Sequence, residues 1–193
     1  MSEDDGESLR AFAMETCRRT GELLNESDDV EVKNIASELE GQMRLETCIG
    51  RPFELRGVTM DGQPFDWDSY RGRIVLVDFW ATWCGPCIAE SENIKAAYKK
   101  FHEKGFDVVG ISIDRERSDL EEYLKKAAYP WTVLWDPALN EGAEDGEDRT
   151  MNVFYGIQAI PTVILVDRDG KAITMDCRGE ELHEILGELL GED

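Results

Sequence analysis

The chain has 193 residues, 41% of them hydrophobic, which fits one main domain with a small appendage. Its 42 acidic and 21 basic side chains give a formal charge of −21, so it would repel nucleic-acid phosphates and we expect no nucleic-acid partner. No apolar stretch approaches the roughly 20 residues that a membrane-spanning helix needs. The N-terminus is acidic where a signal peptide would be basic and then apolar. We therefore expect no membrane contact by this segment itself.

The first 46 residues are strongly acidic, with 13 acidic and 5 basic side chains. Apolar residues recur there at helical spacing on both sides of a polar break at 25–31. This pattern predicts two amphipathic helices, the second capped by Ser27, Asp28 or Asp29. We expect residues 1–48 to form an acidic helical extension and residues 49–193 to form the main domain.

The hydrophobic period changes after residue 50. Apolar residues on both sides of the turn signal Asp61-Gly62 predict a β-hairpin, and the apolar run at 74–80 predicts a central strand buried on both faces. The remaining pattern predicts strands at 106–114, 131–136, 162–167 and 171–177, helices at 87–105, 118–128, 150–156 and 180–190, and an acidic loop at 138–149. Strands that alternate with helices and end in an antiparallel pair indicate an α/β fold with a mixed sheet flanked by helices.

The stretch FWATWCGPC, residues 79–87, places Cys84 and Cys87 three positions apart, between that central strand and a helix. A zinc site would need two more cysteine or histidine ligands, usually paired, and the others are scattered singly. A purely structural disulfide across so small a loop would stabilise little. Redox chemistry is the remaining interpretation. We expect no metal and no cofactor other than the Cys84–Cys87 disulfide/dithiol itself.

The position of the pair favours different roles for its two cysteines. Amides of the first helical turn and the helix dipole favour a thiolate at Cys84. Pro86 suits the first turn because its missing N–H is not needed there. Cys87, one turn further in, is expected to be less exposed and to attack a mixed disulfide formed at Cys84.

From about Gly50 to Leu190 the chain resembles thioredoxin-like proteins, particularly the TlpA/ResA-like branch. IVLVDFWATWCGPC resembles the active-site strand and turn of that family. YGIQAIPTVILVDRDGK resembles the segment that supplies a cis-proline opposite the cysteines, and residues 50–80 resemble the N-terminal hairpin of TlpA/ResA-like proteins. The resemblance implies a thioredoxin fold, whereas the acidic stretch 138–148 and the helices before residue 46 have no counterpart in it.

The resemblance also implies catalytic roles for two acidic residues. A carboxylate is costly inside an apolar strand, and Asp78 would be the buried proton acceptor that helps Cys87 deprotonate. Glu90 matches an acidic position common in TlpA/ResA-like helices. The alternatives are a surface-facing strand residue for Asp78 and a solvated helix residue for Glu90.

A substrate-binding surface is implied next to the cysteines. Pro161 would follow a cis bond after Ile160, and the neighbouring backbone would pair with an extended substrate strand. Trp83 and Trp80 flank the site and would line a substrate surface, with core packing as the alternative for Trp80. Gly85 and Pro86 are implied to bind substrate as well, and Thr82 and Gly85 shape the turn.

The other cysteines and the histidines are interpreted as structural. Cys17, Cys48 and Cys177 read as buried free thiols, with a Cys17–Cys48 disulfide as the alternative. His102 and His183 are expected to be surface or packing residues rather than ligands.

The resemblance implies a thiol-disulfide oxidoreductase that reduces protein disulfides through a mixed disulfide. Its partners would be protein disulfide or dithiol substrates and an upstream thiol reductant. A peroxiredoxin-like thiol peroxidase is one alternative, although the proline that accompanies threonine ahead of a peroxidatic cysteine is missing here. A redox-silent protein-binding module is the other.

The branch also bears on location. TlpA/ResA-like proteins usually act outside the cytoplasm, so we expect the full-length bacterial protein to be extracytoplasmic, with this chain lacking its export signal. A cytoplasmic protein is the alternative.

Overall fold

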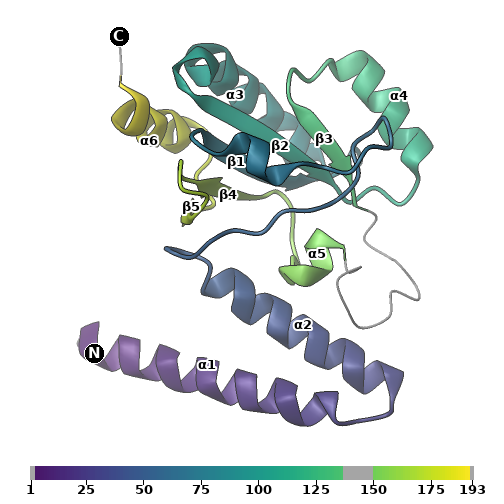
Figure 1. Cartoon of the computed structure of the whole chain (residues 1–193), viewed down its shortest axis with the longest axis vertical. Coiled ribbons are helices and arrows are strands. Elements are labelled where there is room, and N and C mark those ends of the chain that lie inside the picture. The colour runs from purple at the N-terminus through teal and green to yellow at the C-terminus, as the bar shows by residue number, and fades with distance from the viewer. Residues whose placement is uncertain (1–2, 137–149, 192–193) are drawn as a thin grey trace. The chain divides into compact units, whose positions relative to one another are not determined.

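The computed structural model describes residues 3–136 and 150–191. The acidic loop predicted at 138–149 lies outside these residues. The chain divides into two compact units, one made of Met1–Thr47 with Asn152–Gln158, the other of Cys48–Met151 with Ala159–Asp193. The second unit contains the β-sheet (Figure 1).

The sheet has five strands in the order β3-β2-β1-β4-β5 (Figure 1). Their bounds are β1 Ile74–Trp80, β2 Phe106–Ser112, β3 Thr132–Trp135, β4 Thr162–Val166 and β5 Ala172–Met175. β1, β2 and β3 are parallel, while β4 runs antiparallel to both β1 and β5. Every residue of β1 is buried, as expected for a central strand covered on both faces. The predicted mixed sheet of an α/β thioredoxin fold is confirmed.

Three helices supply the core on one face of the sheet: α3 (Gly85–Phe101), α4 (Arg117–Ala127) and α6 (Glu180–Leu190). Side chains alternate along a strand, and Ile74, Leu76 and Trp80 of β1 belong to the same buried cluster as apolar residues of these helices. After α3 the chain makes the short 3₁₀ helix η2 (His102–Lys104), which ends at Gly105 with φ 103°. Glycine favours this left-handed conformation, so Gly105 stops the helix as predicted.

The segment before β1 is less regular than the predicted hairpin. The chain turns at Asp61-Gly62, but only one antiparallel bridge, Val58 with Pro64, joins the two arms. Two backbone hydrogen bonds accompany this bridge, from the Thr59 N–H to the Gln63 carbonyl at 2.9 Å and from the Phe65 N–H to the Gly57 carbonyl at 3.0 Å. The second arm continues into the 3₁₀ helix η1 (Trp67–Tyr70), capped by Asp66. The expected hairpin is thus reduced to a turn with a single bridge.

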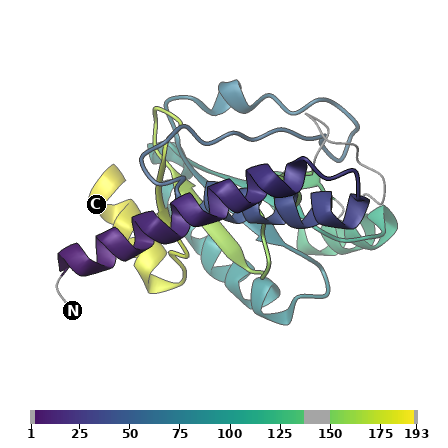
Figure 2. The ribbon, with the colours of Figure 1, turned by 90° about the horizontal axis from the view of Figure 1, so that it is seen from below.

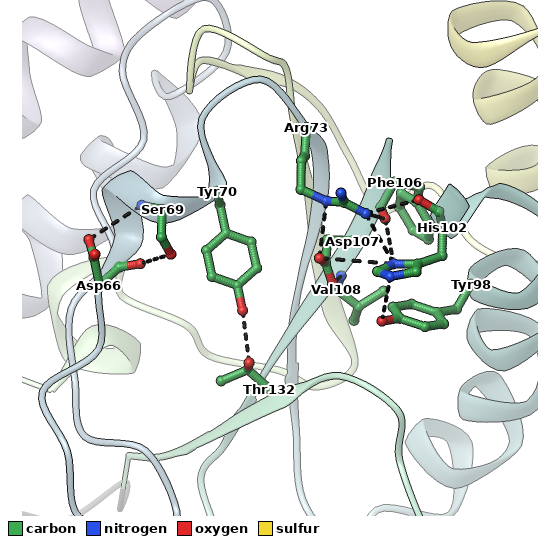
Figure 3. A network of polar contacts seen from close by, with 10 residues as sticks. All are labelled: Asp66, Ser69, Tyr70, Arg73, Tyr98, His102, Phe106, Asp107, Val108 and Thr132. Carbon is green, nitrogen blue, oxygen red and sulfur yellow. Dashed lines mark hydrogen bonds and ion pairs between the residues drawn. The ribbon is translucent and has the colours of Figure 1, made fainter. Parts of the chain in front are cut away.

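A network of polar side chains fastens the beginning of β1 to the beginning of β2 (Figure 3). Nη2 of Arg73 donates to the carbonyl oxygens of His102 and Phe106 at 2.9 and 2.7 Å, and its Nε lies 3.1 Å from a carboxylate oxygen of Asp107. The ring of His102 stacks on Tyr98 at 4.2 Å. His102 is therefore a packing residue, as predicted, within a specific network.

The N-terminal helices form an antiparallel pair, α1 (Glu3–Asn25) and α2 (Val30–Glu46) (Figures 1 and 2). Asp29 caps α2 by accepting hydrogen bonds from the backbone N–H groups of Glu31 and Val32, which confirms one of the three predicted caps. The amide of Asn25 donates to Glu40 across the pair at 2.6 Å. Within the described residues no helix is long and apolar enough to cross a membrane.

Residues 152–158, which the sequence did not group with these helices, pack against α2. They include most of the short helix α5 (Met151–Phe154). The guanidinium of Arg44 lies 3.8 Å above the Phe154 ring and donates to its carbonyl oxygen. Gly41 of α2 meets Gly156 so closely that neither position has room for a side chain.

Gly41→Ala should destabilise this unit. The added Cβ would lie 2.6 Å from the Gly156 nitrogen and 2.7 Å from the Val153 carbonyl oxygen, and neither backbone atom can move aside. Overpacking of this kind costs roughly 1–3 kcal/mol. Helix melting followed by circular dichroism measures the change.

Gly21→Ala in α1 is the matched control. Its Cβ would come no closer than 3.6 Å to the Glu40 side chain, and alanine gains roughly 1 kcal/mol over glycine in a helix. The two substitutions should therefore shift the melting temperature in opposite directions. A stabilising Gly41→Ala would contradict the close contact.

Candidate active site

The cysteine pair lies at the start of α3. Cys84 is the N-cap residue and Cys87 lies in the first turn, and the two form a disulfide with their Cα atoms 5.2 Å apart. The backbone nitrogen of Cys87 lies 3.2 Å from Sγ of Cys84, so a first-turn N–H points at that sulfur. Such an N–H, together with the helix dipole, stabilises a thiolate on Cys84 once the disulfide is reduced.

Access to the pair comes from one exposed strip of chain. Both cysteines are buried, with 6% of Cys84 and 3% of Cys87 exposed. Trp83 beside them is 67% exposed, and Gly85 and Pro86 are exposed as well. These three exposed residues lie next to the cysteines in the chain, and the substrate-binding role that the family resemblance implies for them stays a prediction.

The loop before β4 lies against the cysteines. The Ile160–Pro161 peptide bond is cis, which confirms the expectation drawn from the family resemblance. The carbonyl oxygen of Ile160 lies 3.8 Å from Sγ of Cys84, although the two residues are 76 positions apart. The structure thus brings the two predicted sequence motifs into one site.

Asp78 lies within β1 with only 6% of its surface exposed. Its Oδ1 is buried and has no hydrogen-bond partner among the described residues. The pKa of Asp78 is raised to about 7, chiefly by burial and also by the nearby charge of Glu90, while the charge of Arg178 lowers it in part. The alternative of a surface-facing strand residue is therefore excluded, and the carboxyl group can gain or lose a proton near neutral pH.

Glu90 is half-buried on α3 and has a structural contact that the sequence did not indicate. Its Oε1 accepts a hydrogen bond from the backbone N–H of Gly179 at 2.8 Å, and its Oε2 accepts one from the Asn93 amide. Gly179 precedes α6 and offers no side chain to cap it. Glu90 therefore ties α3 to the beginning of α6 and also lies near enough to Asp78 to affect its pKa.

Trp80 does not line a surface. It is 2% exposed and packs against Tyr123 and Tyr129 with ring centroids 5.5 and 5.3 Å away. The core-packing alternative is therefore correct, and Trp83 alone of the two tryptophans faces solvent.

Asp114, just after β2, is a site residue that the sequence reasoning missed. It is 2% exposed, and its carboxylate accepts hydrogen bonds from the backbone N–H of Thr82 at 3.0 Å and from the Thr82 hydroxyl at 2.6 Å. Ser112 and Trp135 hold Asp114 in turn, through the Ser112 hydroxyl and the indole N–H. The loop that leads into Cys84 is thereby fixed to the end of the neighbouring strand.

The remaining cysteines are free thiols, so the alternative of a Cys17–Cys48 disulfide is not realised. Burial raises the pKa of Cys177 to about 11 and also raises that of Cys48, which makes both poor nucleophiles at neutral pH. His183 packs near the Phe101 ring. Across residues 3–136 and 150–191, no group of three or more His, Cys, Asp or Glu side chains could hold a metal ion.

Asp78→Asn should change how stability depends on pH. Because the folded-state pKa lies above the ordinary value of 3.8, the wild type loses stability as pH rises from about 4 to about 7. The variant lacks this loss, so the difference between the two should be small at pH 4, grow toward pH 7 and then level off. The full effect is on the order of 3–4 kcal/mol.

Urea unfolding of the oxidised proteins between pH 4 and pH 8 measures this difference. A difference that does not change with pH would mean that Asp78 titrates near its ordinary value, as an exposed carboxyl does.

Thr82→Val should loosen the loop before Cys84, because valine keeps the shape but loses the hydroxyl that Asp114 binds. Loss of a hydrogen bond to a charged group costs roughly 1.5–3 kcal/mol. Amide hydrogen exchange at residues 82–85 should accelerate at least tenfold, while amides of α6 keep their rates. Thr82→Ser retains the hydroxyl and should exchange like the wild type; equal acceleration in both variants would rule out the Asp114 contact as the cause.

Comparison with known proteins places this site in a family. The sequence model described as Redoxin matches residues 47–185. The thiol-disulfide oxidoreductase ResA of Bacillus thuringiensis is 29% identical over 131 residues, which are 68% of this chain and 69% of ResA. Human nucleoredoxin is 32% identical over 126 residues, 64% of this chain but 27% of nucleoredoxin.

Solved structures that resemble this chain include thiol-disulfide oxidoreductases. The thioredoxin domain of a thiol-disulfide oxidoreductase from Bacteroides vulgatus superposes with a TM-score of 0.63 and 26% identity, covering 74% of this chain and 97% of that domain. Since the redoxin match spans well over half of the sequence, this chain belongs to the redoxin family, in the TlpA/ResA-like branch of the thioredoxin superfamily.

Proposed function

We propose that this redoxin is a thiol-disulfide oxidoreductase that reduces disulfides in protein substrates. One observation carries the proposal: a Cys84–Cys87 disulfide at a helix N-terminus, with the carbonyl of Ile160 before cis-Pro161 lying 3.8 Å from Sγ of Cys84. The likeness to ResA, which is named a thiol-disulfide oxidoreductase, supports the same class of enzyme.

In the proposed reaction the reduced protein attacks with the Cys84 thiolate. The thiolate bonds to one sulfur of a substrate disulfide, and the other substrate sulfur leaves as a thiolate. Cys87 then attacks Cys84, which releases the second substrate thiol and leaves the Cys84–Cys87 disulfide. Two electrons have passed to the substrate, so an upstream thiol reductant must restore the dithiol.

Asp78 is the proposed proton acceptor for Cys87. A base is most useful when its pKa lies near the working pH, and burial brings the pKa of Asp78 to about 7. Glu90 would assist Asp78 in one of two ways: by taking the proton from Asp78, or by keeping the pKa of Asp78 high. The second role follows from its charge alone.

The proposed substrate seat combines an exposed turn with a half-buried segment. Trp83, Gly85 and Pro86 form the surface over the disulfide, and Ile160 with Pro161 forms the opposite side next to Cys84. An extended substrate segment would lie along the Ile160 backbone, with its disulfide directed at Cys84. This arrangement suits unfolded or loop-borne disulfides in proteins.

Two other functions fit the fold less well. A thiol peroxidase would need a peroxidatic cysteine preceded by the characteristic proline and threonine. Cys84 lacks that proline and is instead joined in a disulfide to Cys87, three residues away. A redox-silent docking module would have no use for a disulfide at the helix start beside a carboxyl group that titrates near neutral pH. We further propose an extracytoplasmic location, in keeping with the TlpA/ResA-like branch.

Cys84→Ser should abolish the reduction of insulin by dithiothreitol in the presence of the protein, because it removes the attacking thiolate. Cys87→Ser keeps that thiolate but lacks the resolving thiol, so it should accumulate mixed disulfides that a reductant releases. Gel shifts without reductant, with mass spectrometry of the adducts, measure both effects.

The double variant Cys84→Ser, Cys87→Ser is the control. Adducts that persist in it would assign the reactivity to Cys17, Cys48 or Cys177. Rapid peroxide consumption by the wild type would favour the peroxidase. A potential far more oxidising than the roughly −270 mV of thioredoxin would reverse the proposed direction.

A further inference from the structure

Three buried polar atoms on one face of the sheet share an unusual property. Oδ1 of Asp78, Nε1 of Trp80 and Nε1 of Trp131 are all buried and have no hydrogen-bond partner within the described part of the chain. The three residues are only 6%, 2% and 8% exposed. Buried polar groups in folded proteins nearly always have partners, so three together need an explanation.

The strand register places these residues around Gly110. Asp78 of β1 pairs with Gly110 of β2, which in turn pairs with Val133 of β3. Side chains two residues apart on a strand share a face, so Trp80 lies on the same face as Asp78. Trp131, two residues before Val133, reaches that face from the chain leading into β3.

The two indole nitrogens converge on the space above Gly110. A Cβ placed on Gly110 would lie 3.0 Å from Nε1 of Trp80 and 3.5 Å from Nε1 of Trp131. Gly110 does not have a positive φ, so its backbone conformation does not call for glycine. The absence of a side chain instead lets both indole nitrogens come close to the backbone of the residue that pairs with Asp78.

The chemistry of the three groups is complementary to one small ligand. Each indole offers a single donor, and an ionised carboxylate offers only acceptors. A water molecule accepts two hydrogen bonds and donates two, so it can take both indole N–H groups and donate to Asp78. Two to four polar partners is the usual number for a buried water.

We propose that a structural water is bound above Gly110, held by the indole N–H groups of Trp80 and Trp131 and donating to the carboxylate of Asp78. Trp80 and Trp131 are then positioning residues, since they act on the acid through the water. That water hydrates the carboxylate inside the sheet and favours its charged form. Its relevance to proton transfer rests on the proposed function, but its existence does not.

Other groups face Asp78 and must be separated from this effect. Glu90 acts on it from α3, Arg178 from the connection between β5 and α6, and Tyr129 from the segment before β3. Glu90 opposes the charged form and Arg178 favours it. Trp131→Phe leaves Glu90 and Arg178 unchanged and keeps an aromatic ring beside Tyr129, on which Trp131 stacks.

The site also has a route for exchange with solvent. Trp131 stacks on Tyr129 at 4.7 Å, and both rings line an open groove of about 470 Å³. A bound water would thus lie behind one layer of aromatic side chains. Exchange on a slow timescale is expected, which makes the water observable by magnetisation transfer.

The first test uses the oxidised full chain and does not depend on activity. Nuclear Overhauser or exchange-relayed transfer from water to the indole Hε1 protons of Trp80 and Trp131 should be seen. The solvent-bonded indole of an exposed residue, Trp83, calibrates the signal, and Trp67, whose N–H is bonded to the Phe53 carbonyl, should show none. No transfer to either buried indole would overturn the proposal.

The second test is the titration of the Asp78 carboxyl carbon by NMR in Trp131→Phe, with Trp67→Phe as the matched control. Loss of one donor to the water weakens the hydrogen bond from the water to the Asp78 carboxylate. The pH midpoint of the Asp78 titration should therefore rise by roughly half to one pH unit in Trp131→Phe. Trp67→Phe removes a satisfied indole bond on another part of the molecule and should not move it. Identical titrations in both variants would mean that the Trp131 N–H is simply unpaired.

Gly110→Ala gives an independent check, because its methyl group would lie 3.0 Å from Nε1 of Trp80 and 3.5 Å from Nε1 of Trp131 and would crowd out a water between them. The variant should raise the pH midpoint of the Asp78 titration and at the same time abolish magnetisation transfer from water to the Trp80 indole proton. A raised midpoint of the Asp78 titration with the transfer to Trp80 retained would contradict the proposed water site. If Gly110→Ala does not fold, the measurements on the wild type and on Trp131→Phe still decide whether the water is bound. None of these measurements depends on insulin reduction, so a failure of the proposed function would not affect them.

Discussion

The site depends on keeping one carboxyl group inside the central strand of the sheet. β1 must be buried along its whole length because it lies between β2 and β4 and has a helical layer on one face. Burial of Asp78 there raises its pKa to about 7, and an apolar residue would be more stable in its place. The surroundings reduce this cost only in part, through Arg178. This buried carboxyl group, close enough to Glu90 of α3 for the two charges to interact, is the one to which we assign proton transfer in the proposed function.

Two other carboxylates fix the frame around the disulfide by accepting backbone hydrogen bonds. Asp114 holds Thr82 on the chain that enters Cys84, and Glu90 holds Gly179 on the chain that enters α6. One anchor lies before the cysteines and the other lies one turn after them. The start of α3 is thereby fixed from both sides, which keeps Sγ of Cys84 beside the Ile160 carbonyl without any large movement of the helix. A small part of the large negative charge thus has a specific structural use.

The sequence indicated those features that depend on runs of apolar residues and on their periodic spacing. The buried strands, α3 and the cysteine pair at its start all follow from apolar patterning and helix-start chemistry, and the cis-proline follows from resemblance. Asp114 could not be found in this way, because its partner is known only once the end of β2 is seen beside the end of β1. The hairpin is shorter than predicted, with a single bridge between Val58 and Pro64. Gly110 did carry a signal, since glycine inside a strand often marks a close approach.

The helical extension is linked to the redoxin domain through shared chain rather than added at its end. The redoxin match covers residues 47–185, yet residues 152–158 within it pack with α1 and α2. The contact at Gly41 and Gly156 is too close for any side chain, so this packing is specific. Two residues after this stretch come Ile160 and the cis-proline. Residues 152–158 thus pack within the helical unit, whereas the carbonyl of Ile160, two residues further along the chain, lies 3.8 Å from Sγ of Cys84.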